Sequence, residues 1–229
     1  MKVLESQALD RKSRKWPEKE VLHYHEAILY WFEKIKQQWG IGYNFLLELQ
    51  SLIEPNKRWV RQLPWTVIAN GYGEVLYTPP VWEDTIASLL SNLEKFMNTH
   101  NDDIDPVIKM PVIHYQFESI HPFYDGNGRT WRILNILYLI LSKKLDYPIL
   151  FLSEYINASR KTYYSLLNQS HITTDYTDII AYLLEGIIVQ AKKTSDKITK
   201  IHALMRETEN QIALLKLDYA KITLILFTY

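Results

Sequence analysis

Several features that would point to a particular class of protein are missing from this sequence of 229 residues. It contains no cysteine, which excludes disulfide bonds, thiolate metal sites and a cysteine nucleophile, and gives no support to an oxidising compartment. Its 26 basic and 26 acidic side chains cancel, so no overall field draws the chain to nucleic acid or to an anionic membrane. Any anion site must therefore be local.

Long apolar runs are missing as well. The longest purely apolar stretch covers residues 136–141, far short of the roughly 20 residues that a membrane-spanning helix needs. The first residues also lack the apolar core of a signal peptide. We therefore expect a soluble protein of the cytoplasm that has no membrane partner.

Glycine and proline are scarce, with 7 and 9 residues, and most of the sequence between them repeats apolar residues at helical spacing. This pattern predicts a mainly α fold. The segment TWRILNILYLILSKKL, residues 130–145, is apolar on nearly every side, which is typical of a helix in the middle of a bundle. The expected helices cover residues 17 to about 40, 43–53, a segment after residue 80, a segment from residue 106, this central helix, a helix within 151–167, and 177 to about 200.

In one segment the apolar residues no longer repeat at helical spacing. In WTVIANGYGEVLYTPP, residues 65–80, β-branched and aromatic residues flank a tip that contains glycine, which predicts a β-hairpin. An exposed strand edge can pair with an extended segment of another protein. The alternative is an ordinary surface hairpin without a partner.

The stretch HPFYDGNGRTWRIL, residues 121–134, places a cluster of polar groups just before the central helix. Gly126, Asn127 and Gly128 tolerate positive φ and can turn successive N–H groups toward one point. Together with the first turn of a helix, they predict an anion nest suited to phosphate. Arg129 and Arg132 share a helix face and can add charge-assisted bonds. This pattern favours a polyphosphate ligand.

Two further residues of this stretch suggest chemistry. Asp125 is a hard oxygen donor placed where a phosphate-bound Mg²⁺ would need one. His121 could accept a proton from an attacking hydroxyl near neutral pH. The alternatives are a common DGNG turn, a histidine in a loop and arginines on a solvated helix face. No G-x-x-x-x-G-K-[ST] sequence is present, which disfavours a P-loop. His114 is interpreted as a hydrogen-bonding residue at the edge of the core.

The segment HPFYDGNGRTWR resembles the signature of the Fic family, H-x-F-x-[D/E]-G-N-G-R-x-x-R, at every specified position. The sequence IEPNKRWVRQLPWTVIANGYGEVLYTPP is similar to the segment that carries the family's substrate-docking flap. HYQFESI and LSEYINASRKTYYSLL resemble the stretches before and after the signature. The resemblance implies a helical bundle with a small β-hairpin flap, of the bacterial kind that continues into a winged helix.

By this resemblance the protein is an adenylyltransferase, an AMPylator that transfers AMP from ATP to a hydroxyl of a target protein. His121 would be the catalytic base, Asp125 would hold Mg²⁺, and Phe123 would anchor the loop in the core. The nucleotide's phosphates would be bound by Gly126, Asn127, Gly128, Arg129 and Arg132. The target would dock on the flap through Val67, Ile68, Gly73, Glu74, Val75 and Tyr77.

The resemblance also leaves other functions open. A phosphotransferase, a de-AMPylase and a non-catalytic nucleotide-binding or regulatory module are the alternatives, the last favoured if Trp131 blocks the nest. The family's inhibitory pattern [S/T]-x-x-x-E-[G/N] is not matched, so an inhibitory glutamate would come from a partner or a missing segment. Nucleic acid would be bound only through a missing winged helix. We expect N-terminal helices over 1–60, the core over 61–175 and a C-terminal extension over 176–229.

Overall fold

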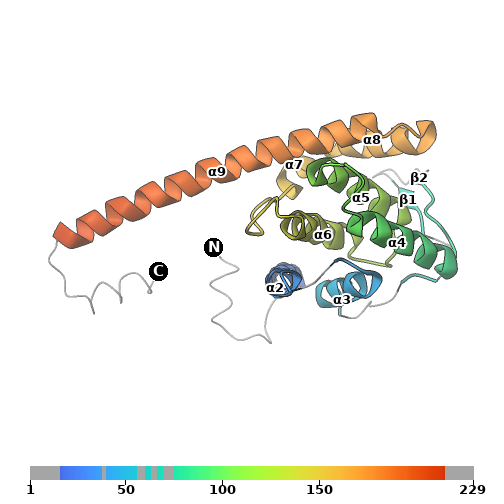
Figure 1. Cartoon of the computed structure of the whole chain (residues 1–229), viewed down its shortest axis with the longest axis horizontal. Coiled ribbons are helices and arrows are strands. Elements are labelled where there is room, and N and C mark those ends of the chain that lie inside the picture. Colours follow the sequence, from blue (N-terminus) through green and yellow to red (C-terminus); the bar gives the residue numbers. More distant parts are fainter. Residues whose placement is uncertain (1–15, 38–39, 56–59, 63–65, 70–74, 215–229) are drawn as a thin grey trace.

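The computed structural model describes residues 16–37, 40–55, 60–62, 66–69 and 75–214. These residues form eight helices and one two-stranded sheet, which confirms the mainly α fold (Figure 1). The elements are α2 (Trp16–Ile35), α3 (Tyr43–Ile53), β1 (Ile68–Ala69), β2 (Val75–Tyr77), α4 (Glu83–Asn98), α5 (Pro106–Ile120), α6 (Asn127–Leu141), α7 (Ser153–Ala158), α8 (Arg160–Thr173) and α9 (Thr177–Leu214).

Helix α6 lies at the centre of the bundle, as its all-round apolar sequence predicts. Residues 133–140 are all buried, with Ile133, Leu134 and Leu137 fully so. The helix packs against α5, α2 and α3. Each buried aliphatic side chain contributes roughly 1.5–3 kcal/mol to the stability of the fold. The many buried side chains of α6 therefore fix this helix, and with it the position of its first turn.

Helix α5 packs beside α6 (Figure 1). It begins at a cap in which the Asp105 carboxylate accepts the N–H of Val107 at 2.7 Å, with Pro106 at the first helical position. It ends at His121, whose backbone is left-handed. The short loop of residues 121–126 therefore joins the two central helices and sits on a rigid base.

Within the segment predicted as a hairpin, β1 and β2 form an antiparallel pair in which Ile68 is opposite Tyr77. Strand β2 contacts α8. Val67 and Val75 are exposed. The predicted flap residues Gly73 and Glu74 lie outside the described residues.

Helix α9 is longer than the sequence analysis expected, since it reaches Leu214 instead of ending near residue 200. Its first half packs on the bundle and buries Ile179 and Leu183, whereas residues 195–211 are almost all exposed and extend past the bundle (Figure 1). The helix continues because residues 200–214 contain no glycine or proline to stop it. Among the described residues, no helix combines the length and apolarity required to cross a bilayer.

Candidate functional site

His121 is the first residue of the loop that joins α5 to α6. Its backbone is left-handed, with φ of 46°, which costs a residue other than glycine roughly 1–3 kcal/mol. Its Nδ1 atom lies 3.7 Å from Oε2 of Glu118, one turn earlier in α5. Nδ1 is buried and makes no hydrogen bond with the described residues. The imidazole is about one-quarter exposed, so His121 can accept a proton from a bound hydroxyl.

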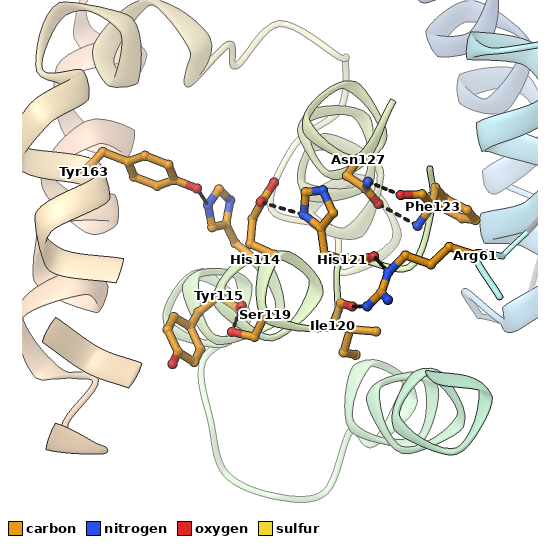
Figure 2. Close-up of polar contacts among 10 residues, drawn as sticks. Arg61, His114, Tyr115, Ser119, Ile120, His121, Phe123, Asn127 and Tyr163 are labelled. Atoms are coloured by element: carbon orange, nitrogen blue, oxygen red, sulfur yellow. Dashed lines mark hydrogen bonds and ion pairs between the residues drawn. The ribbon is translucent and has the colours of Figure 1, made fainter. Parts of the chain in front are cut away.

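The side chain of Asn127 closes this loop. Its carboxamide oxygen accepts the N–H of Phe123 at 3.0 Å, and its Nδ2 donates to the Phe123 carbonyl at 2.7 Å (Figure 2). Phe123 is fully buried and forms a backbone bridge with Val60. The expectation that Phe123 anchors the loop in the core is confirmed. The buried amide of Asn127 faces the loop, so this residue can offer a ligand only its backbone N–H.

Gly126 gives the loop its final turn into α6. Its φ is +82°, and a Cβ at this position would lie 3.2 Å from Cγ of Glu54, so only glycine fits without strain. The N–H of Gly126 donates to Oδ1 of Asp125 at 2.7 Å. The next N–H groups, in the first turn of α6, have no acceptor within their own helix and lie at its positive end. These are the donors that can bind an anion.

The two arginines of the motif have different surroundings. The Arg129 guanidinium is paired with three carboxylates: Glu54 at 2.5 Å, and Glu20 and Asp125 at 3.3 Å each. No described carboxylate pairs with Arg132, whose Nη1 lies 3.8 Å from the position that a Cβ on Gly128 would take. Arg132 is therefore the arginine with a guanidinium available to a ligand at the nest.

Trp131 belongs to the core. It is 4% exposed, and its ring contacts the His114 imidazole edge-on, with ring centroids 4.0 Å apart. His114 is wholly buried and bonds to the Tyr163 hydroxyl at 2.7 Å and to Nδ2 of Asn135 at 3.0 Å. Burial lowers the pKa of His114 to about 4, so the ring is neutral. The sequence analysis placed His114 at the edge of the core. In the structure it lies inside the core.

A pocket of about 470 Å³, with its opening to solvent included, lies beside His121. One wall is formed by Tyr77, whose ring stacks on His171 of α8 with centroids 3.7 Å apart and planes 3° from parallel. The His171 ring is held by the Tyr115 hydroxyl at 2.8 Å, and burial lowers its pKa. The residues that line the pocket are Ile68, Tyr77, Glu118, His121, Tyr164, Leu167, Asn168 and His171.

The structure brings together most of the residues that the sequence analysis singled out. The nest residues, both arginines, Asp125 and His121 lie on one loop and the first two turns of α6. Of the predicted flap residues, Ile68 and Tyr77 line the pocket.

Other residues of the site were not predicted. Glu118 shares a helix face with His121, and its spacing of three was a usable signal. Glu54 and Arg61 reach the loop from distant segments, and nothing in the sequence pattern indicates this. Tyr164, Leu167, Asn168 and His171 were also missed.

Asp125 is the residue that could hold a metal ion. Its side chain is 42% exposed next to the nest, and a phosphate-bound Mg²⁺ usually takes only one or two protein carboxylates. In the part of the chain that the structure describes, no group of three or more candidate ligands exists.

Comparison with known proteins gives a consistent result. A sequence profile of the Fic/DOC family matches residues 15–139. The protein adenylyltransferase Fic of Nematostella vectensis is 37% identical over 103 residues, which cover 42% of this chain and 21% of that protein. The protein adenylyltransferase fic-1 of Caenorhabditis elegans is 31% identical over 127 residues, 52% of this chain and 24% of that protein.

A solved structure resembles this one over most of the chain. A Fic family protein from Desulfovibrio desulfuricans superposes with a TM-score of 0.69 at 23% identity, over 87% of this chain and 59% of that one. At that identity the likeness concerns the fold. The chain spans about a fifth to a quarter of the length of the curated relatives it matches.

Proposed function

Because this chain belongs to the Fic/DOC family, we propose that it transfers AMP from ATP to a hydroxyl group of a target protein. The observation that carries the proposal is the meeting of three parts at the junction of α5 and α6. These parts are a base at His121, an anion nest in the first turn of α6, and a pocket with aromatic walls. The two curated relatives, named as protein adenylyltransferases, support the same activity.

The triphosphate of ATP binds at the first turn of α6. The N–H groups of Asn127, Gly128 and Arg129 point out of the helix end, where the macrodipole favours negative charge. Arg132 adds a guanidinium beside Gly128. Asp125 is placed to hold Mg²⁺, an ion that neutralises phosphate charge when bound. Arg129 contributes mainly by fixing Asp125 and Glu54 around the nest.

The nucleoside occupies the pocket beside His121. A purine is flat and aromatic, and the Tyr77, Tyr164 and His171 rings that line the pocket offer surfaces of the same kind. Asn168 adds a carboxamide that can hydrogen-bond to the edge of a base. This placement puts the α-phosphate between the pocket and the nest, next to His121.

The reaction is a displacement at the α-phosphorus. Nε2 of His121 takes the proton of the target's hydroxyl as its oxygen attacks; the new oxygen–phosphorus bond forms, the bond to the bridging oxygen of the β-phosphate breaks, and pyrophosphate leaves. Such transfers depend on positioning and on charge stabilisation. Strand β2, whose Val75 is exposed, is the place where an extended target segment can pair and bring its hydroxyl in line.

Labelled ATP tests the proposal. The chain is incubated with Mg²⁺, a cell lysate and ATP labelled at the α- or the γ-phosphate, and compared with the His121→Ala variant. We expect label from α-labelled ATP on protein with the unaltered chain and not with the variant. Equal labelling by both would remove the claim, and label from the γ-position would indicate a phosphotransferase.

The place of Trp131 bears on the choice between an enzyme and a non-catalytic module. Its ring is buried against His114 and does not line the pocket beside His121, but its Nε1 lies 3.8 Å from the position that a Cβ on Gly128 would take, as close as Nη1 of Arg132. Calorimetry with ATP and Mg²⁺ tests this point directly, because a module with a blocked pocket would give no heat of binding. We expect binding, weakened by Arg132→Ala.

A further inference from the structure

Arg61 is a fully buried arginine whose partners are all main-chain carbonyls. Its Nε donates to the carbonyl of His121 at 2.7 Å, and one Nη atom donates to the carbonyl of Ile120 at 3.1 Å and to that of Pro80. The N–H of Arg61 itself donates to the carbonyl of Pro122 at 2.9 Å. Figure 2 shows the guanidinium beside the end of α5. Among the described residues, no carboxylate forms an ion pair with it.

Burying a guanidinium without a carboxylate is costly. The carbonyls at the end of α5 offset this cost, because the last carbonyls of a helix lack partners within it and carry the negative end of the dipole. The hydrogen bonds from Arg61 therefore stabilise the turn of residues 120–122, since all three carbonyls of this turn accept a hydrogen bond from Arg61.

This turn decides where the base points. His121 is left-handed, a conformation that persists in a residue other than glycine only when its surroundings impose it. The N–H of His121 donates to the carbonyl of Phe117 at 2.9 Å, and its carbonyl is held by Arg61. With both sides of the residue fixed, the direction of its Cα–Cβ bond is set, and the imidazole lines the pocket together with Glu118 and Tyr77.

The same guanidinium also reaches the segment that follows β2. Pro80, whose carbonyl it binds, is three residues after Tyr77, and Tyr77 lines the pocket together with His121. One side chain thus ties together the turn that carries the base and the chain that leads out of the strand pair. The spacing between His121 and Tyr77 in the pocket therefore depends on Arg61.

We propose that Arg61 is a positioning residue for the transfer reaction, which sets the left-handed turn at His121 and its spacing from the wall formed by Tyr77. The proposal rests on the proposed function for its kinetic consequence, but its structural consequence can be measured without any activity. Arg61 touches no reacting atom. Its loss should therefore act on the rate of transfer and leave ATP binding largely unchanged.

The kinetic test compares Arg61→Ala and Arg61→Lys with Lys109→Ala. Lys109 is also buried, binds the Thr99 carbonyl at 2.6 Å and pairs with Asp102, and so controls for the loss of a buried cation remote from the loop. We expect the labelling rate at saturating ATP to fall roughly ten- to a hundredfold in Arg61→Ala, less in Arg61→Lys, with little change in the KM for ATP. Millimolar guanidinium should restore part of the rate in Arg61→Ala. A loss no larger than in Lys109→Ala would overturn the proposal.

The second test follows the His121 imidazole by NMR in protein labelled at histidine, with His121→Ala to assign the signal. We expect the signal to move in Arg61→Lys, which keeps the charge and can bind only part of the carbonyl set, and to stay in place in Lys109→Ala. An unmoved signal in Arg61→Lys overturns the proposal. If the unaltered chain transfers no label at all, the proposed function fails, and this experiment still decides whether Arg61 positions His121.

Discussion

At the scale of single residues, the two glycines of the nest are under different constraints. Gly126 has a φ of +82° and its missing Cβ would meet Glu54, whereas Gly128 is helical and a Cβ there would make only ordinary contacts, at 3.8 Å. We expect Gly126→Ala to lower the free energy of unfolding by roughly 1–2 kcal/mol, as measured by urea denaturation. Its binding of ATP should weaken as well, because the turn into α6 shifts.

Gly128→Ala is the matched variant for this experiment. Alanine is favourable in a helix, so the free energy of unfolding should stay the same or rise, while ATP binding falls because a methyl group now stands beside the nest. Equal destabilisation of the two variants would contradict the idea that the positive φ at Gly126 is the source of the strain.

The carboxylates around Arg129 should also differ in their contributions. Glu54 is 5% exposed and lies 2.5 Å from the guanidinium, whereas Glu20 is 43% exposed and lies at 3.3 Å. We expect Glu54→Gln to lower the free energy of unfolding by roughly 1–3 kcal/mol, because removing one partner of a buried pair leaves the other poorly compensated. Denaturation by urea measures this difference.

Glu20→Gln is the control, with an expected change of less than about 0.5 kcal/mol for an exposed pair in water. The order of the two effects is the informative result. If Glu20→Gln were the more damaging change, the buried contact between α3 and the motif loop would not be the one that supports the nest.

At the scale of the elements, α9 meets α7 at a glycine. A Cβ on Gly186 would lie 2.7 Å from Cδ1 of Tyr155. Helix propensity alone would make Gly186→Ala stabilising by about 1 kcal/mol. We expect the opposite sign, a loss of roughly 1–3 kcal/mol, because overpacking forces the two helices apart. Thermal or urea unfolding distinguishes the two signs.

Two further variants test the cause of this effect. Ser195→Ala changes an exposed position in the same helix and should alter the free energy of unfolding by less than about 0.5 kcal/mol. Tyr155→Leu combined with Gly186→Ala should lose less than the sum of the single changes, because the clash disappears. Full additivity would show that the ring of Tyr155 is not what limits the approach of α9.

The elements themselves were largely predictable from the sequence, because apolar spacing and helix-ending residues are local signals. The helix at residues 43–53 and the start of another at Pro106 were predicted correctly. The end of α9 was not, since nothing local marks it. Arg61 and Glu54 could not be assigned to the site because they lie 60 and 75 residues from their partners His121 and Arg129. The packing of α3 against α6 brings Glu54 to Arg129, and the backbone bridge between Val60 and Phe123 brings Arg61 to the loop.

At the scale of the whole molecule, the core contains a chain of buried polar groups that joins three helices. His114 of α5 bonds to Asn135 of α6 and to Tyr163 of α8. Burial raises the pKa of the Tyr163 hydroxyl well above its usual value, so both rings are neutral in the folded protein. Glu118 and Arg132 are the charged groups that act on His114, with opposite effects on its pKa. Burial, aided by Arg132, outweighs Glu118 and lowers the pKa, and the folded state therefore resists protonation here.

This neutral histidine predicts how the stability of the protein depends on pH. In the unfolded chain His114 takes up a proton near pH 6.5, while in the folded protein its pKa is about 4, so acidification between these values favours the unfolded state. We expect the unaltered chain to lose about 2 kcal/mol more than His114→Gln between pH 7 and pH 5, as measured by urea unfolding at each pH. His171→Gln is the control: burial lowers the pKa of His171 too, but its ring lies at the pocket wall, so this variant should keep most of the dependence. If the free energy of unfolding of His114→Gln fell with pH in parallel with that of the unaltered protein, the core would accept a charged His114 ring. The hydrogen bonds among His114, Asn135 and Tyr163 would then not depend on a neutral histidine.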